Sequence, residues 1–168
     1  HLLPGDFASG LNDQEAAIVW HLRAPRVVLG ALVGAMLASA GGAYQGVFRN
    51  PLADPYLLGV AAGAGLGATA ALAGGLDAAV VPIAAFIGAV VAVAATYYFA
   101  QAAGGRRTPA TLILAGVAVG SFLTAVQTFL QQQSSDRIRE VFTWILGRLS
   151  GATWSQVLAV LPYVVGAM

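Results

Sequence analysis

The chain has 168 residues, of which only 9% are charged and 58% are hydrophobic, with a net charge of +1. Soluble domains average about 25% charged residues, so the composition excludes an ordinary water-soluble fold and favours lipid as the solvent. The small net charge gives no basis for binding nucleic acid, and the lack of cysteine excludes disulfides and thiolate metal sites. We therefore expect an all-α, polytopic transmembrane helical bundle in contact with a lipid bilayer.

The chain begins with a segment, residues 1–26, that contains a short predicted helix. Asn12 and Glu15 have the spacing of a capping box, which opens a helix running to about Leu22. Pro25 is expected to end this helix before the first membrane span, because proline cannot donate a helical hydrogen bond.

Apolar runs predict about five membrane spans, the last of them incomplete. The first run has 22 residues, which reach about 33 Å as a helix and can cross a hydrocarbon core of about 30 Å. The five runs are residues 27–48, 57–76, 78–100, 110–132 and 155–168. The second is rich in glycine, so we expect part of it to be irregular backbone buried against its neighbours. Residues 135–148 are predicted to form a short amphipathic helix at the membrane interface.

Glycines recur at four-residue spacing along three of these spans. The sets are Gly30 and Gly34; Gly59, Gly63 and Gly67; and Gly116 and Gly120. Each set shares one helical face, which predicts close packing of helices in a compact bundle.

The short loops predict how the chain is oriented in the membrane. Arg49 follows the first span and Arg106 and Arg107 follow the third, whereas residues 74–77 contain no basic residue. The positive-inside rule places these three arginines in the cytoplasm. The N-terminal segment and residues 134–153 are then expected to face outward, although both also contain arginine.

The sequence shows no catalytic, cofactor-binding or metal-binding constellation. Residues 65–70 match a G-x-G-x-x-A fingerprint, but they lie inside an apolar span with no acidic residue about 20 positions on. A Walker A sequence is absent, and His1 and His21 are too isolated to predict a metal site. We expect no catalytic residue and no cofactor.

The most specific motif runs from Arg23 to Gly59. It reads Arg23-Ala-Pro-Arg26, then a span of small residues, then Gln45-Gly-Val-Phe-Arg-Asn-Pro-Leu-Ala-Asp-Pro-Tyr-Leu-Leu-Gly59. Two further matches follow in order, Leu112-Ile-Leu-Ala-Gly-Val-Ala118 and Trp144-Ile-Leu-Gly-Arg-Leu-Ser150. Together they resemble the FecCD-type permeases of binding-protein-dependent ABC importers for iron-siderophore, haem and cobalamin. Ala24 departs from the pattern, which usually has leucine there.

The resemblance implies a permease that lines a translocation pathway in the bacterial cytoplasmic (inner) membrane. Such a permease has roughly ten helices and works as a homodimer with two cytoplasmic ABC ATPase subunits and an extracytoplasmic substrate-binding protein. The chain begins at His1 and stops at Met168 inside an apolar run, so we expect a piece that supplies the second to sixth helices, without the region that contacts the ATPase. Two alternatives stay open: an unrelated channel or secondary transporter, and a transport-inactive structural fragment.

The resemblance also implies roles for arginines in the outer segment. In the family, Arg23 and Arg26 match positions that receive acidic residues of the binding protein, and an exposed guanidinium suits a carboxylate. Ordinary anchoring at the membrane interface is the alternative.

The fourth span carries polar residues at spacings of three and four. They are Ser121, Thr124, Thr128 and Gln131, with Gln127 close by. A polar face in lipid should meet protein or water, and in the family this helix lines the central pathway. Interhelical hydrogen bonding is an equally good reading.

Two further positions matter in the family comparison. Thr108 and Pro109 match the cytoplasmic gate, although a plain connector explains them equally well, and the proline departs from the usual small hydroxylic residues. Arg49, Asn50, Pro51, Asp54 and Pro55 predict a structural corner at the membrane edge, because the prolines forbid a continuous helix. Asp54 is expected to pair with Arg49, and contact with substrate is the less favoured reading.

Overall fold

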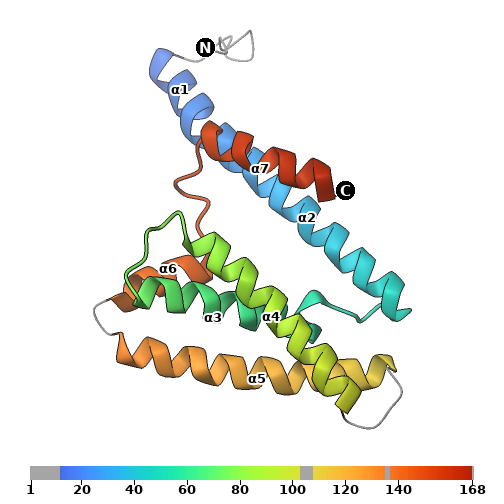
Figure 1. Cartoon of the computed structure of the whole chain (residues 1–168). Helices are drawn as coiled ribbons and strands as arrows, with labels where there is room; N and C mark the ends of the chain where they lie inside the picture. The colour runs from blue at the N-terminus through green and yellow to red at the C-terminus, as the bar shows by residue number, and fades with distance from the viewer. Residues whose placement is uncertain (1–11, 103–107, 135–136, 168) are drawn as a thin grey trace. The chain divides into compact units, whose positions relative to one another are not determined.

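A computed structural model describes residues 12–102, 108–134 and 137–167, and every regular element among them is helical (Figure 1). The chain divides into two compact units. The terminal unit contains the residues up to Ala40 and those from Arg148 onward, and the central unit is Gly41–Gly147. The elements in order are α1 Asp13–Ile18, the π-helical turn η1 Val19–Arg23, α2 Ala24–Phe48, the 3-10 turn η2 Pro55–Leu58, α3 Val60–Ala73, α4 Val81–Ala102, α5 Pro109–Gln133, α6 Ile138–Leu146 and α7 Trp154–Ala167.

The first helix begins at the predicted capping box. The side chain of Asn12 accepts a hydrogen bond from the backbone N–H of Glu15 at 2.8 Å, and the carboxylate of Glu15 accepts from the N–H of Asn12 at 3.0 Å. This capping box is confirmed, and it satisfies two N–H groups that a helix start otherwise leaves open.

The predicted break at Pro25 is wrong, because α1, η1 and α2 form one continuous helix. The π-helical turn explains how the proline is accommodated: the N–H of Ala24 bonds to the carbonyl of Val19, five residues back. The same five-residue spacing would pair the next residue, Pro25, with the carbonyl of Trp20, but proline has no N–H to donate. The indole Nε1 of Trp154 donates to this carbonyl instead, at 3.0 Å.

Within the described residues, three helical stretches are long and apolar enough to cross a membrane. They are Asp13–Phe48, Val81–Ala102 and Pro109–Gln133. The predicted second span divides into η2 and α3, and α3 has only 14 residues, about 21 Å at 1.5 Å per residue. The irregular backbone expected in this run is present at Gly59, which joins η2 to α3 with φ +74°. α7 is also a short apolar helix.

In the central unit, α3 packs chiefly against α4 and α5. Glycines bring the backbones of α3 and α4 together. A Cβ on Gly63 would overlap the carbonyl oxygen of Gly88, and a Cβ on Gly67 would overlap that of Ala84. The predicted close packing is confirmed at these two glycines of α3, which fits the requirement for small residues where lipid supplies no hydrophobic drive.

A second glycine contact joins α5 to the turn before α3. A Cβ on Gly116 would overlap the carbonyl oxygen of Leu57, and the backbone of Gly120 lies against Gly59. By contrast, a Cβ built on Gly34 of α2 would meet no packed neighbour within 4 Å among the described residues. The four-residue spacing therefore predicted the packed faces of α3 and α5, but Gly34 has no such contact within the described residues.

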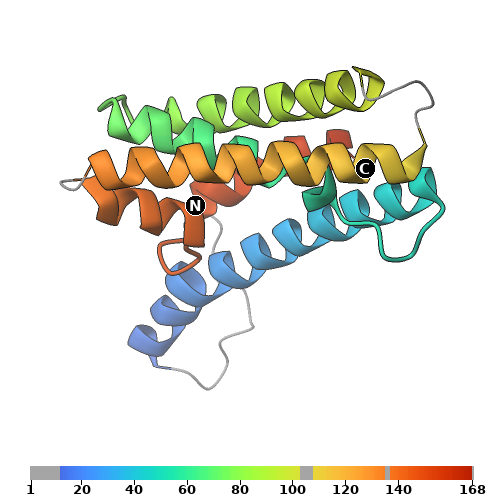
Figure 2. The ribbon, with the colours of Figure 1, turned by 90° about the horizontal axis from the view of Figure 1, so that it is seen from below.

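The predicted amphipathic helix is α6, which contacts α3 and α5 and lies beside one end of α5 (Figure 2). Val141 on its inner face is fully buried, and Gly147 ends the helix with φ +70°. Arg137, just before α6, donates from Nη1 to the carbonyl of Leu72 at 3.2 Å, near the C-terminus of α3. A cation at a helix C-terminus is favourable because the last carbonyls there lack helical partners.

Candidate functional site

The structural corner after α2 is built on hydrogen bonds to its own backbone. Arg49 has φ +48°, its N–H points to the carbonyl of Gly46, and the N–H of Asn50 bonds to the carbonyl of Gln45 at 3.1 Å. This is a Schellman ending with arginine where glycine is usual. The side chain of Asn50 then accepts from the N–H of Leu52 at 2.9 Å, which turns the chain into the Pro51 segment.

The second half of the corner is a capped 3-10 turn. Asp54 accepts from the N–H of Tyr56 at 2.7 Å, with Pro55 at the first position of the turn. Among the described residues, Asp54 makes this bond and no ion pair with Arg49. The buried hydroxyl of Thr96 on α4 donates to the carbonyl of Leu58 at 3.0 Å, so the corner is fixed to the bundle.

Thr108 and Pro109, predicted at a cytoplasmic gate, form the start of α5. The hydroxyl of Thr108 accepts from the N–H of Thr111 at 3.2 Å and lies 2.7 Å from that residue's hydroxyl. Pro109 occupies the first helical position, where its missing N–H costs nothing. Arg106 and Arg107, which carried part of the orientation argument, lie outside the described residues.

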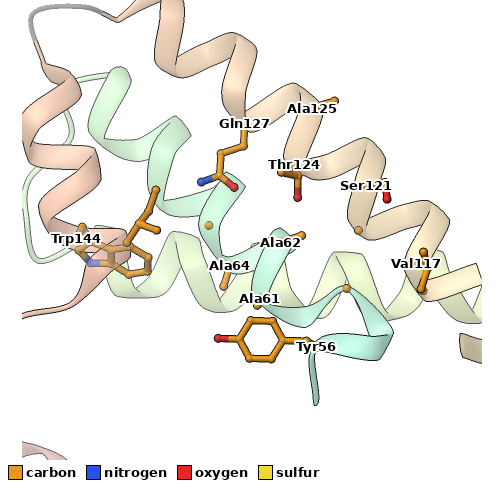
Figure 3. Close-up of a pocket in the computed structure, with 15 residues that line it drawn as sticks. Tyr56, Ala61, Ala62, Ala64, Val117, Ser121, Thr124, Ala125, Gln127 and Trp144 are labelled. Carbon is orange, nitrogen blue, oxygen red and sulfur yellow. The ribbon is translucent and has the colours of Figure 1, made fainter. Parts of the chain in front are cut away.

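A cleft of about 1000 Å³ opens between α3, α5 and α6 in the central unit (Figure 3). Three of the five predicted pathway residues line it, namely Ser121, Thr124 and Gln127. Spacings of three place them along one side of α5. The sequence pattern therefore selected side chains that the fold brings to one cavity.

Gln127 reaches from α5 to α3 across this cleft (Figure 3). A Cβ on Gly65 would lie 2.8 Å from its Oε1 and 3.1 Å from its Nε2. The amide thus occupies the space that a side chain on Gly65 would need. Gly65, which belongs to the discounted dinucleotide fingerprint, has a packing role instead.

The remaining two pathway candidates are placed differently. Thr128 donates to the carbonyl of Thr124 on its own helix at 2.9 Å, and neither Thr128 nor Gln131 lines the cleft. A threonine hydroxyl that bonds one turn back is a common way to satisfy it in a helix. Gln131 is half-buried.

Two aromatic residues that were not singled out as site residues also line the cleft, Tyr56 of η2 and Trp144 of α6. Both lie within the motifs that resemble the family, and nothing else in the sequence marked them as candidate site residues. All the lining residues are uncharged. The cleft can therefore offer hydroxyl and amide hydrogen bonds and aromatic contacts to a ligand, but its lining includes no acidic or basic side chain.

The two predicted docking arginines, both in the terminal unit, differ in their surroundings. Arg26 donates from Nε to the carbonyl of Leu149 at 3.2 Å and from Nη2 to that of Ser150 at 2.8 Å. Arg23 is exposed and has no bonded partner among the described residues. Neither the motif nor helical spacing predicted the bonds of Arg26, because its acceptors lie more than 120 residues away in sequence.

Comparison with known proteins gives the family. A model described as the FecCD transport family matches residues 3–168 of the chain. The chain belongs to this FecCD family. As a FecCD protein with several long apolar helices, it is a multi-pass membrane protein of a transport family.

Its relatives are named permeases. The cobalamin import system permease protein BtuC of Halobacterium salinarum is 46% identical over 159 residues, which cover 93% of this chain and 42% of the relative. The uncharacterized ABC transporter permease protein YvrB of Bacillus subtilis is 40% identical, covering 87% and 43%. The achromobactin transport system permease protein CbrC of Dickeya dadantii is 41% identical, covering 88% and 43%. The chain therefore spans less than half the length of each of these relatives.

A solved structure supports the fold. An inward-facing conformation of a metal-chelate type ABC transporter matches with a TM-score of 0.79 and 24% identity, over 92% of this chain and 49% of that one. At this identity the likeness confirms the all-α membrane-permease fold alone.

Proposed function

We propose that this chain is part of the permease of a binding-protein-dependent ABC importer for cobalamin, an iron chelate or haem. The observation that carries the proposal is the 46% identity to a cobalamin import permease across 93% of the chain. The achromobactin transport permease, at 41% identity, supports the wider range of cargo. Transport would be powered by a separate cytoplasmic ATPase, with the permease itself performing no covalent chemistry.

We place the translocation pathway along the polar side of α5. The neutral cleft lined by Ser121, Thr124 and Gln127 supports this placement, because uncharged hydroxyl and amide groups can let a large polar cargo slide without trapping it in one strong ion pair. Thr128 and Gln131 continue the same polar side of α5 and belong to the proposal. Thr108 and Pro109 would lie at the cytoplasmic gate, at the capped start of α5.

The remaining partners follow from the same proposal. A second permease copy completes a homodimer, ABC ATPase subunits bind on the cytoplasmic side, and a substrate-binding protein docks on the outer side near Arg23 and Arg26. The membrane would be the bacterial cytoplasmic membrane. The corner at Arg49 to Pro55 is assigned a structural role, supported by the hydrogen bonds of Asn50 and Asp54 to the backbone.

Reconstituted transport tests the proposal. The full-length parent protein is placed in liposomes with its ATPase subunits, and uptake of cyanocobalamin, a ferric siderophore and haem is measured with the partner binding protein and ATP. We expect one cargo class to accumulate only when both are present. A control with an inactive ATPase should show no accumulation. Uptake that needs neither ATP nor binding protein would contradict the proposal and favour a channel or secondary transporter.

A further inference from the structure

Two aromatic side chains from different elements line the cleft between α3, α5 and α6. Tyr56 belongs to η2 and Trp144 to α6, and both share the cleft with the polar side chains of α5 (Figure 3). Tyr56 is 71% exposed and Trp144 is 37% exposed. Aromatic rings with this much free surface in a concave site are available for contact with a ligand.

The backbone that carries each ring is held in place by the fold. Tyr56 donates its N–H to the carboxylate of Asp54 at 2.7 Å, and the turn that contains it accepts a hydrogen bond from Thr96 of α4 at 3.0 Å. Trp144 lies on α6, which contacts α3 and α5 and carries the fully buried Val141. Because both elements are already fixed, a ligand that contacts the two rings does not have to order them first.

The polar groups of the cleft are not used by the fold. The side chains of Ser121, Thr124 and Gln127 have no hydrogen-bond partner in the part of the chain that the structure describes. The same holds for the hydroxyl and indole N–H of the two aromatic residues. Thr128, which does not line the cleft, donates instead to its own helix. The cleft therefore keeps hydroxyl, amide and indole groups free to bond a ligand.

The lining also determines which ligand charge the cleft tolerates. Its described residues include no acidic or basic side chain. A carboxylate that entered would lose part of its hydration and would meet no cation to replace it. A neutral amide, by contrast, can donate to and accept from the hydroxyl and amide groups of α5. The cleft should consequently favour uncharged, amide-bearing ligands over carboxylates.

We propose that Tyr56 and Trp144 are cargo-contacting residues, and that the cleft selects an uncharged cargo with amide groups around a conjugated ring. This inference rests on the proposed function, in which the cleft belongs to the pathway, and it selects among the cargo classes proposed there. Cobalamin has amide groups around a conjugated corrin ring. Haem has a conjugated ring but carries carboxylates, and a ferric carboxylate chelate has carboxylates and no such ring.

A pair of cargoes that differ in one charge tests the selection. The full-length parent transporter is placed in liposomes with its ATPase subunits, and the initial uptake rate is measured with ATP and the partner binding protein. The probes are cyanocobalamin and its monocarboxylate derivative, in which one side-chain amide of the ring is hydrolysed. The affinity of the binding protein for each probe is measured separately, so that uptake is compared at equal occupancy of that protein. We expect cyanocobalamin to enter about tenfold faster.

Variants of the lining test the residues. Trp144→Leu and Tyr56→Leu remove a ring and should each slow cyanocobalamin uptake about two- to tenfold, whereas Trp144→Phe and Tyr56→Phe keep a ring and should retain most of it. Gln127→Lys adds a cation and should shift the ratio of the two uptake rates about threefold toward the monocarboxylate. This ratio does not depend on how much of a variant folds. Phe86→Leu, at a 70% exposed position of α4 outside the cleft, is the matched control and should behave as wild type.

The contrary outcomes separate this inference from the proposed function. Equal uptake of the two probes, with a ratio that Gln127→Lys leaves unchanged, overturns the selection by charge. Wild-type uptake by both leucine variants, or an equal loss in the phenylalanine variants, overturns the contact by the rings. Accumulation of haem or ferric citrate without cyanocobalamin overturns the cargo class but leaves the importer standing. If none of these cargoes accumulates with ATP and binding protein, the proposed function itself fails.

Discussion

The contact between α3 and α4 gives a prediction whose size follows from the structure. Gly63 lies in the buried face of α3, and the group opposite it is the backbone carbonyl of Gly88, with the Cβ of Ala92 beside it. A methyl group added at Gly63 would overlap that carbonyl. Because the obstacle is backbone and not the end of a flexible side chain, the two helices must move apart for Gly63→Ala to fit.

The expected change in the free energy of unfolding combines two opposing effects. Overpacking of a fitted contact costs about 1 to 3 kcal/mol, and the upper part of that range applies here because only a shift of helix backbone relieves the overlap. Alanine recovers about 1 kcal/mol of helix propensity relative to glycine. The matched control is Gly42→Ala in α2, where the added Cβ would meet no packed neighbour within 4 Å among the described residues and only the propensity gain is expected. The two variants should therefore differ in unfolding free energy by about 2 to 3 kcal/mol.

Equilibrium unfolding of the chain in detergent, followed by helical circular dichroism, measures this difference. We expect Gly63→Ala to be less stable than wild type and Gly42→Ala to be as stable or more stable. If the two variants differ by less than about 0.5 kcal/mol, the α3–α4 contact is looser than the structure shows and the reasoning from overlap is refuted.

Three further stability changes should be measurable by the same unfolding assay. Arg137→Ala removes the donor to the Leu72 carbonyl at the end of α3 and should cost about 1 kcal/mol, whereas an unchanged stability would mean that the bond is fully replaced by water. Trp154→Phe keeps an aromatic ring beside Trp20 but loses the indole donor, so a loss of about 0.5 to 1.5 kcal/mol is expected, and a gain would contradict the assigned bond. Thr69→Val replaces a fully buried hydroxyl that has no partner among the described residues and should be neutral or stabilising by about 1 kcal/mol, while a marked loss would indicate a bond to that hydroxyl.

The sequence predicted the features that depend on local pattern. The long apolar runs correspond to α2, α4 and α5, because length and hydropathy are sufficient to identify such helices. The capping box at Asn12 and the irregular backbone at Gly59 were also predictable, since both depend on residues close together in the chain. The polar side of α5, part of which lines the cleft, was also predictable, because it too depends on residues close together in the chain.

Features that depend on distant residues were not predictable. Pro25 was expected to stop a helix, but a π-helical turn and the donor from Trp154 accommodate it. The bonds of Arg26 and Arg137 go to backbone carbonyls, which carry no sequence signature at all. The positive-inside rule does not explain why the segments predicted to face outward contain arginine. The bonds of Arg26 and Arg137 to backbone carbonyls give these two arginines a structural reason to be there.

The polar stripe of α5 was only partly informative about the cleft. Helical spacing placed Ser121, Thr124 and Thr128 together, but spacing cannot show that Thr128 bonds back to its own helix. Nor could it show that Gln127 crosses to α3, since that position depends on the missing side chain of Gly65.

Labelling of single cysteines on α5 tests most directly the central claim that its polar side lines a passage for cargo. The chain contains no cysteine, so Thr124→Cys and the control Phe122→Cys each introduce one thiol into it. Thr124 lines the cleft, whereas Phe122 does not line it and is 67% exposed on the same helix. In the proposed dimer in membranes, a membrane-impermeant maleimide should label Thr124→Cys, more slowly when cargo is bound, and should leave Phe122→Cys unlabelled. Protection of Thr124→Cys in every transport state would contradict the pathway.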